Sequence, residues 1–174
     1  MPLSPVALVP VAALAALLLS PSATAAVAAV GASGFVVHLE ADTTLAPGAA
    51  WTRLGRPADW WSGAHTYSGK SANLSLELAP GGCFCEALPG GGFVRHLEVA
   101  YVLPGRVLRL TGALGPLQPM GLGGALTFTL TPAAGGTHLV VDYAVAGFAP
   151  HGFEGLAGAV DGVLAEQLAR LAQP

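Results

Sequence analysis

Charge is scarce in this chain. Only 10% of its 174 residues are charged, and seven Lys and Arg side chains stand against ten Asp and Glu. The basic residues form no stripe along the sequence, and the sequence pI is about 5.9. A protein that binds nucleic acid or an anionic membrane surface needs clustered positive charge. The composition therefore predicts neither kind of partner.

Motifs that hold metals, cofactors or a hydrolase nucleophile are lacking too. The chain contains two cysteines, no HExxH spacing and no serine in a G-x-S-x-G context. A closed zinc site needs four ligands, which two cysteines alone cannot supply. Residues 121–124 lack the glycine spacing of a dinucleotide or phosphate loop. We therefore predict no metal and no cofactor.

Long apolar runs are confined to the N-terminal segment. Residues 6–19 are apolar apart from Pro10, a run of about 14 residues, whereas a membrane-spanning helix needs about 20. Because residues 23–25 follow as a small-x-small triplet, we predict a signal peptide over residues 1–25 and a periplasmic or secreted protein with no stable membrane span. A retained N-terminal membrane anchor is the alternative, since residues 1–5 contain no Lys or Arg.

The remaining sequence predicts one domain. Small residues over 26–34 indicate a flexible linker, and 35–173 has the size of an ordinary single domain. Short helices, interrupted at Gly55 and Pro57, are expected within 49–61. Tight turns rich in Pro and Gly join the strands, which indicates an antiparallel meander. Alternating apolar and polar residues predict strands at 35–45, 74–78, 83–88, 93–103, 107–111, 126–131 and 139–145.

The chain closes with an amphipathic helix. Its glycines at 155, 158 and 162 each cost about 1 kcal/mol relative to alanine. These glycines have two possible explanations. They allow the helix to approach another element closely or to line a space, or they simply reflect the glycine-rich composition of the chain. The pattern predicts an α+β fold in which a curved antiparallel sheet of about six to seven strands wraps the helix, with a cavity between them. One buried stripe is formed by Phe153, Leu156, Ala157, Val160, Val163, Leu164, Leu168 and Leu171.

Several short segments resemble the SRPBCC superfamily, whose members are also called START-like or helix-grip proteins. The resemblance is greatest to a polyketide cyclase-like subgroup, also likened to the activator of the heat-shock chaperone ATPase. It implies a helix-grip fold and a ligand cavity, but the fold determines function only weakly, because the superfamily includes lipid carriers, receptors, cyclases and co-chaperones. The resembling segments are Trp60-Trp61, residues 65–69 (HTYSG), 73–76 (NLSL), 81–86 (GGCFCE) and 115–118 (GPLQ).

Three residues are the candidates for acid–base chemistry. Histidine titrates near neutral pH, so His65 and His96 could each move a proton. In a regular strand His96 and Glu98 share one face and could act as a pair. If that face points to solvent, they are ordinary strand polar residues.

Aromatic side chains are the candidates for ligand contacts. Indoles and phenols combine apolar area with one polar atom, which suits the mouth of a cavity. Packing in the core is the alternative for each of them. The predicted ligand-binding residues are Trp60, Trp61, Tyr67, Tyr101 and Tyr143.

The two cysteines leave three possibilities open. Cys83 and Cys85 are two apart in a predicted strand, a separation of about 6.6 Å that suits a disulfide poorly unless the backbone bends. Buried free thiols are therefore the first expectation. An oxidising compartment would favour a strained bridge instead. A metal or redox role is the third possibility.

The sequence supports three functional hypotheses. The first is an exported protein that binds a small apolar or amphipathic ligand without chemistry. The second is a cyclase- or isomerase-type enzyme that uses His65, His96 and Glu98 in the cavity. The third is a protein-interaction module of the co-chaperone type, against which predicted export counts.

Overall fold

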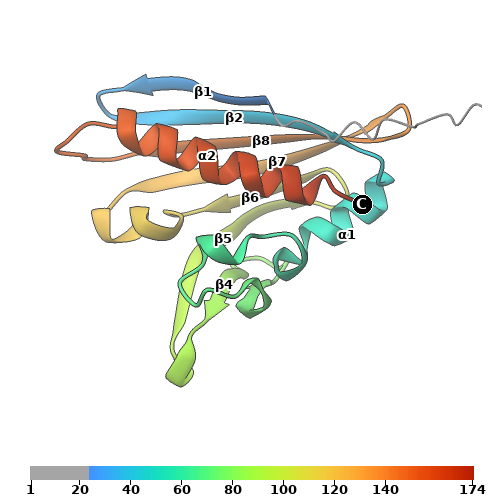
Figure 1. Cartoon of the computed structure of the whole chain (residues 1–174), viewed down its shortest axis with the longest axis horizontal. Helices are drawn as coiled ribbons and strands as arrows, with labels where there is room; N and C mark the ends of the chain where they lie inside the picture. Colours follow the sequence, from blue (N-terminus) through green and yellow to red (C-terminus); the bar gives the residue numbers. More distant parts are fainter. Residues whose placement is uncertain (1–23) are drawn as a thin grey trace, which may run out of the picture.

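The computed structural model describes residues 24–174. Eight strands form one antiparallel sheet in the order β1-β2-β8-β7-β6-β5-β4-β3 (Figure 1). The architecture is α+β, as predicted. The strands are β1 (Thr24–Gly31), β2 (Gly34–Thr43), β3 (Leu74–Leu76), β4 (Cys83–Ala87), β5 (Phe93–Leu103), β6 (Val107–Thr111), β7 (Gly123–Ala133) and β8 (Gly136–Ala146).

One long helix and several short ones accompany the sheet. The expected interrupted helices after β2 are present as α1 and η1, because prolines start each of them and bar a continuous helix. The loop between β6 and β7 contains a 3₁₀ helix. The helices are α1 (Pro47–Leu54), η1 (Pro57–Asp59), η2 (Gly63–His65), η3 (Ser71–Asn73), η4 (Pro89–Gly91), η5 (Gly115–Met120) and α2 (Glu154–Leu171).

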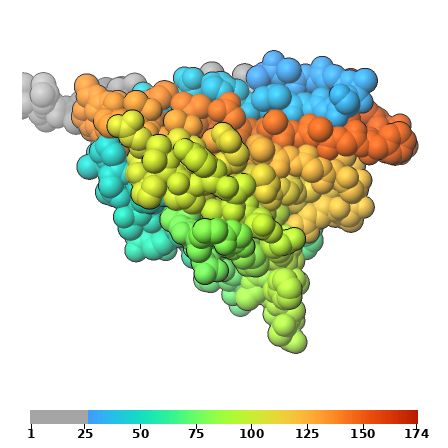
Figure 2. Space-filling view, turned by 180° about the vertical axis from the view of Figure 1, so that it is seen from behind, coloured from blue at the N-terminus to red at the C-terminus, as the bar shows by residue number. Residues whose placement is uncertain are grey.

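Helix α2 lies along one side of the sheet and closes the core. It packs against β1 and β2, while the β3–β5 part of the sheet curves away from it (Figure 1). Ala157, Leu164 and Leu168 are buried on its sheet-facing side. At its C-terminal end the Arg53 side chain donates hydrogen bonds to the carbonyls of Leu171 and Arg170, at 3.2 and 3.1 Å, and ties the helix to α1. Seen from behind, the molecule narrows toward the β4–β5 hairpin (Figure 2).

The strand β1 corrects the prediction of a linker over 26–34. Its sequence is rich in alanine, which has low strand propensity, so the alternation gave no signal. Pairing with β2 overrides that propensity: the two strands form a hairpin that begins at the pair Gly31 and Gly34. A side chain at Gly34 would collide with the Val145 carbonyl oxygen, so glycine is required there. The sheet therefore has one strand more than expected.

The predicted signal peptide falls almost entirely outside the described residues, which begin at Thr24. The predicted cleavage point after Ala25 lies within the first residues of β1. Within residues 24–174, no helix is long and apolar enough to cross a membrane.

The glycines of α2 are not there for close packing. A Cβ built at Gly155, Gly158 or Gly162 meets no atom within 4 Å, and all three positions are exposed. Close approach of the helix to another element is therefore excluded as their reason.

Candidate ligand-binding cavity

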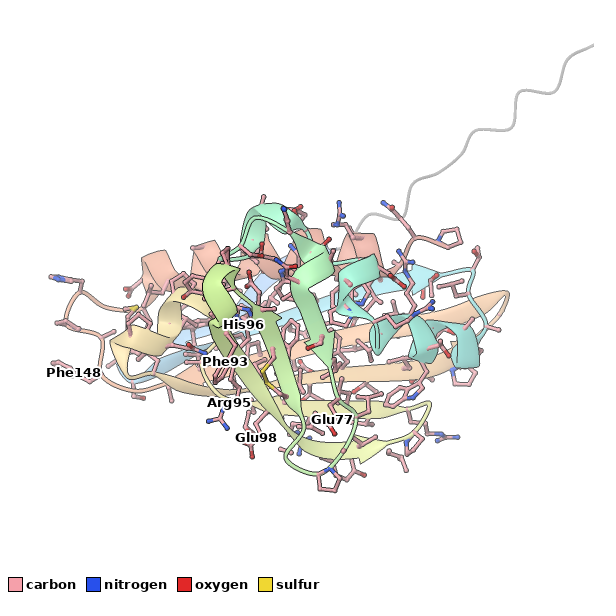
Figure 3. The ribbon with its side chains drawn as sticks, turned by 90° about the horizontal axis from the view of Figure 1, so that it is seen from below. Glu77, Phe93, Arg95, His96, Glu98 and Phe148 are labelled. Carbon is pink, nitrogen blue, oxygen red and sulfur yellow. A yellow bond between two sulfur atoms is a disulfide. The ribbon has the colours of Figure 1, made fainter. Side chains whose placement is uncertain are left out.

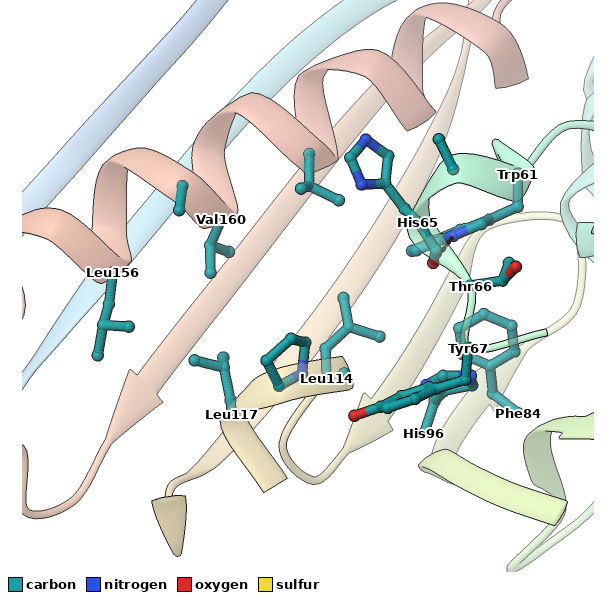
Figure 4. A pocket seen from close by; sticks show the side chains of 15 residues that line it. Trp61, His65, Thr66, Tyr67, Phe84, His96, Leu114, Leu117, Leu156 and Val160 are labelled. Atoms are coloured by element: carbon teal, nitrogen blue, oxygen red, sulfur yellow. Dashed lines mark hydrogen bonds between the residues drawn. The ribbon is translucent and has the colours of Figure 1, made fainter. Parts of the chain in front are cut away.

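A cavity of about 330 Å³ lies beside α2, on the side of the helix next to its sheet-facing residues. Leu156, Ala159, Val160 and Val163 line it from α2 (Figure 4). These positions follow one stripe of the helix, spaced three or four residues apart. The α2 helix therefore presents one apolar stripe to the sheet and a second to the cavity.

Three other parts of the chain complete the cavity wall. The loop after β6 and the start of η5 contribute Leu114, Gly115, Pro116 and Leu117. The segment around η2 contributes Trp61, Ala64, His65, Thr66 and Tyr67, and the sheet contributes Phe84 from β4 and His96 from β5. Most of these side chains are apolar, which suits an apolar ligand with few polar groups.

A β-bulge decides which way His96 points. Arg95 pairs with Cys85 and Leu97 pairs with Phe84, so His96 is an extra residue in β5 with no partner in β4. Such an insertion shifts the alternation of inward and outward side chains by one residue. His96 and Leu97 are consequently both buried.

The bulge overturns the predicted pair of His96 and Glu98. Glu98 points to the outer side of the sheet, where its carboxylate accepts a hydrogen bond from Arg95 at 2.7 Å. Figure 3 shows Arg95 and Glu98 together on the outside of the sheet. The prediction was wrong because it assumed an unbroken period of two along β5.

The partner of His96 is Glu86, on β4. The His96 ring donates from Nε2 to Oε2 of Glu86 at 3.0 Å, and both side chains are buried, with exposed fractions of 5% and 0%. Glu86 also accepts the backbone N–H of Tyr67 at 3.1 Å and that of Ser68. One carboxylate thus joins β4, β5 and the segment after η2.

The electrostatics of this pair assign each group a charge state. Burial raises the pKa of Glu86, but the hydrogen bonds from Ser68, Tyr67 and His96 outweigh it and hold the pKa below its ordinary value. Burial lowers the pKa of His96, and the neighbouring Glu86 carboxylate opposes this only in part. At neutral pH the pair is therefore a carboxylate and a neutral imidazole.

The His96 ring is enclosed by aromatic side chains. Tyr67 stacks over it with ring centroids 5.9 Å apart, and the Phe84 ring lies at 5.3 Å. Its Nδ1 atom is buried and has no hydrogen-bond partner among the described residues.

His65 lies at the exposed rim of the cavity. Its Nε2 is 2.8 Å from Oε2 of Glu166 on α2, with about a third of the His65 side chain exposed. The hydrogen bond with Ser62 and then that with His65 lower the pKa of Glu166. The carbonyl of His65 accepts the indole N–H of Trp61 at 3.0 Å. His65 and His96 both line the cavity, as the enzyme hypothesis requires, but the partner of His96 is Glu86 and not the predicted Glu98.

Of the five aromatic residues predicted to contact a ligand, two line the cavity and three do not. Trp61 and Tyr67 line the cavity. Trp60 is buried in the core, with its ring against Trp61 and Phe128. Tyr101 is exposed beneath the Arg109 guanidinium, and Tyr143 is fully buried, so neither lines this cavity.

Sequence reasoning missed Glu86 as a site residue, although a signal was present. In β4, Phe84 and Glu86 alternate with Cys83 and Cys85, so Glu86 shares the inward face of Phe84. A carboxylate on a buried face is costly without partners and for that reason indicates a polar cluster. The apolar residues of the 114–117 segment carried no comparable signal.

Tyr143 positions the cavity wall from within the core. Its hydroxyl accepts the backbone N–H of Leu114 at 2.9 Å and donates to the Gly112 carbonyl at 3.4 Å, and burial raises its pKa to about 12. We expect Tyr143→Phe to lower the free energy of unfolding by about 1–2 kcal/mol, because the Leu114 N–H loses its acceptor. Urea denaturation measures this, and an unchanged midpoint would contradict the role assigned to the hydroxyl.

Acid is expected to weaken the fold through His96. Its folded-state pKa lies below the ordinary value of 6.5, so the unfolded chain binds the proton first, and stability present above pH 6.5 falls as the pH drops. His96→Gln should remove this part of the decline. His38, whose pKa is raised by Asp142 and Glu40, contributes in the opposite direction and is common to both proteins. Urea denaturation at several pH values tests this, and identical profiles would speak against it.

Cys83 and Cys85 form a disulfide, which corrects the expectation of free thiols. Their Cα atoms are 5.2 Å apart, closer than in a regular strand. The two cysteines lie on β4 directly across from the bulge that His96 forms in β5. The expectation assumed an unbent strand. Within residues 24–174 no three His, Cys, Asp or Glu side chains are grouped closely enough to hold a metal ion.

Comparison with known proteins identifies the fold. No model of a known protein family matches the chain, and no curated protein matches it significantly. Protein MLL2253 from Mesorhizobium loti is 25% identical, with a TM-score of 0.57 over 79% of this chain and 93% of that one. CalU16 from Micromonospora echinospora is 15% identical, with a TM-score of 0.55 over 80% and 73%.

DynU16, described as a putative protein in the dynemicin biosynthetic locus, has the same fold. It is 19% identical to this chain, with a TM-score of 0.54, and the match covers 79% of this chain but only 45% of DynU16. At these identities the likeness shows a shared architecture of curved sheet and C-terminal helix. It is consistent with the helix-grip fold that the sequence predicts.

Proposed function

We propose that this chain is an exported, SRPBCC-like protein that binds a small apolar or amphipathic molecule between α2, η5 and the segment around η2. The observation that carries the proposal is the cavity of about 330 Å³, whose wall is mostly apolar. Sites for small molecules have volumes of about 300–1,000 Å³ and combine apolar walls with a few polar groups. The fold shared with DynU16, from a biosynthetic locus, adds support for a small-molecule ligand.

The binding proposal is tested on protein purified from its natural source. We expect native mass spectrometry to detect a bound molecule of low polarity that is released on unfolding. Adding that molecule back should raise the melting temperature, because a ligand that binds only the folded state stabilises it. A preparation that carries nothing, and whose melting temperature no apolar compound raises, would contradict the proposal.

Export is tested at the N-terminus of the mature protein. A signal peptide cleaved after Ala25 predicts that the secreted or periplasmic protein begins at Ala26. An uncleaved chain in the membrane fraction would favour the N-terminal anchor, and an uncleaved chain in the cytoplasmic fraction would contradict both.

A cyclase- or isomerase-type enzyme is the second candidate. The observation that favours it is the pairing of His96 with a buried carboxylate beside the cavity, since an oriented neutral imidazole can serve as a general base. The expected base is thus His96 with Glu86 in place of the predicted Glu98. Exchange of a bound ligand's acidic C–H for deuterium, faster in the wild type than in His96→Gln, would support this candidate. Equal rates would count against it.

A further inference from the structure

The disulfide of β4 lies on the outer face of the sheet. Phe84 and Glu86 are buried and point inward, so Cys83 and Cys85, which alternate with them, point outward. Both cysteine residues are partly exposed to solvent. A disulfide stabilises a protein mainly by restricting the unfolded chain, and this effect decreases as the closed loop becomes shorter. Because Phe84 alone separates the two cysteines, the bond contributes little stability in this way.

The disulfide shortens β4 at the place where β5 carries its extra residue. The Cα atoms of Cys83 and Cys85 are 5.2 Å apart, against about 6.6 Å for the same spacing in a regular strand. Between the pairs Phe84–Leu97 and Cys85–Arg95, the pairing of the two strands passes over His96. A contracted strand opposite a strand with an inserted residue bends the sheet locally, as a bulge requires. The bond therefore supports the bulge that turns His96 inward.

Charged neighbours make the two sulfur atoms unequal. On β5, Arg95 is paired with Cys85 and Glu98 with Cys83, and paired residues have Cβ atoms about 4.5–5.5 Å apart on one face. Glu77 donates its backbone N–H to the Cys83 carbonyl at 3.1 Å, so a second acidic residue neighbours Cys83. A guanidinium stabilises a thiolate, whereas carboxylates disfavour one. Cleavage that releases Cys85 as the thiolate is therefore favoured.

We propose that Cys83 and Cys85 form a redox-active site: a dithiol reduces their disulfide in the folded protein, and the state of the bond controls ligand binding. A thiolate of the dithiol attacks Sγ of Cys83, the S–S bond breaks, and Cys85 leaves as the thiolate. The second thiol of the dithiol then attacks the mixed disulfide and releases Cys83. Two electrons and two protons pass to the cysteines, and the dithiol is oxidised to its own disulfide.

Reduction is expected to reach the cavity through β4. Phe84, between the two cysteines, lines the cavity, and Glu86, next to Cys85, accepts the hydrogen bond from His96 at 3.0 Å. Without the bond β4 can lengthen, and the bulge opposite it loses a support, so these inward side chains shift. The control of ligand binding rests on the proposed binding function, whereas the redox chemistry does not.

The redox chemistry is tested by reducing the purified protein with dithiothreitol at neutral pH. Alkylation of the released thiols and mass spectrometry give the rate, and circular dichroism shows that the protein stays folded. Arg95 and Glu98 pair with each other at 2.7 Å, so removing one frees the other to act on its sulfur. We expect Arg95→Gln to slow reduction at least about threefold and Glu98→Gln to accelerate it at least about twofold.

The matched control is Arg109→Gln. Arg109 is another exposed arginine, but it lies on β6, where it pairs with Thr127 of β7. Its rate of reduction should stay within about 1.5-fold of the wild type. Because the two test variants are expected to act in opposite directions, a general loss of stability does not reproduce the result. A disulfide that is reduced only on unfolding, or equal rates in Arg95→Gln and Glu98→Gln, would overturn the inference.

The control of binding is tested with 2-naphthol, a small fluorescent molecule that joins an apolar ring system to one hydroxyl group. We expect reduction to weaken its binding at least about fivefold, the lower end of the usual coupling between two sites. The double variant Cys83→Ser/Cys85→Ser should bind 2-naphthol as the reduced protein does, with or without dithiothreitol. By linkage, saturating 2-naphthol should shift the equilibrium with dithiothreitol toward the disulfide by the same factor.

The outcomes separate this inference from the proposed function. If oxidised and reduced wild type bind 2-naphthol equally, the cavity binds ligands but control by the disulfide is overturned. If 2-naphthol binds neither form, the proposed function is contradicted, whereas reduction of the folded protein with the expected dependence on Arg95 and Glu98 would still support the redox site.

Discussion

Replacing Glu86 with alanine is expected to lower the free energy of unfolding by about 2–4 kcal/mol. The carboxylate is completely buried and accepts hydrogen bonds from Tyr67, Ser68 and His96. Its loss leaves the buried Nε2–H of His96 and the part-buried backbone N–H groups of Tyr67 and Ser68 without an acceptor, and an unsatisfied buried donor carries a desolvation cost. Urea denaturation measures the change.

Glu98→Ala is the matched control. Glu98 is the same residue type on the neighbouring strand, but it is partly exposed and pairs with Arg95 at the surface. Exposed ion pairs contribute about 0–1 kcal/mol, so the control should remain close to the wild type. Equal effects of the two substitutions would contradict the role assigned to Glu86 and the inward orientation of its strand face.

Replacing Val160 with tryptophan is expected to weaken binding of 2-naphthol by at least about 30-fold, a loss of about 2 kcal/mol. Val160 lies on the cavity-facing stripe of α2 (Figure 4), and an indole there would occupy part of the 330 Å³ that the ligand requires. Because the new side chain extends into open space, we expect the free energy of unfolding to change by less than about 1 kcal/mol. Calorimetric titration and urea denaturation measure the two quantities.

The control for this substitution is Val140→Trp. Val140 lies on β8 between buried Leu139 and Val141, so its side chain points to the outer face of the sheet. The same change there should leave 2-naphthol binding within about twofold of the wild type. Undiminished binding in Val160→Trp, or an equal loss in both variants, would place the ligand elsewhere.

The periodic parts of the fold were predictable from the sequence. Strands with clean alternation, such as β7 and β8, appear where predicted, because their burial follows the period of their backbone. Helix α2 also appears where predicted, but its single predicted buried stripe is divided: Leu156, Val160 and Val163 line the cavity instead of being buried. Strand β1 was not predictable in the same way. Its alanines carry little preference, and it exists through its pairing with β2.

The candidate site was predictable only in part. His65, Trp61 and Tyr67 were identified by residue type and do line the cavity. The partner of His96 was predicted wrongly, because the bulge inserts one extra residue into β5 and so reverses which side chains point inward. The sequence pattern does not indicate where such an insertion occurs. The disulfide between Cys83 and Cys85 depends on backbone geometry at the same place, which sequence spacing does not reveal.

NMR mapping of 2-naphthol on the methyl groups of the protein tests the central claim most directly. If the cavity beside α2 is the binding site, the shifts that change should be those of Leu114, Leu117, Leu156, Val160 and Val163, which line it. Methyl groups on the outer face, such as Val36 and Val140, should stay unchanged. Shifts spread over the outer face, or none at all at saturating probe, would contradict a ligand-binding cavity at this place.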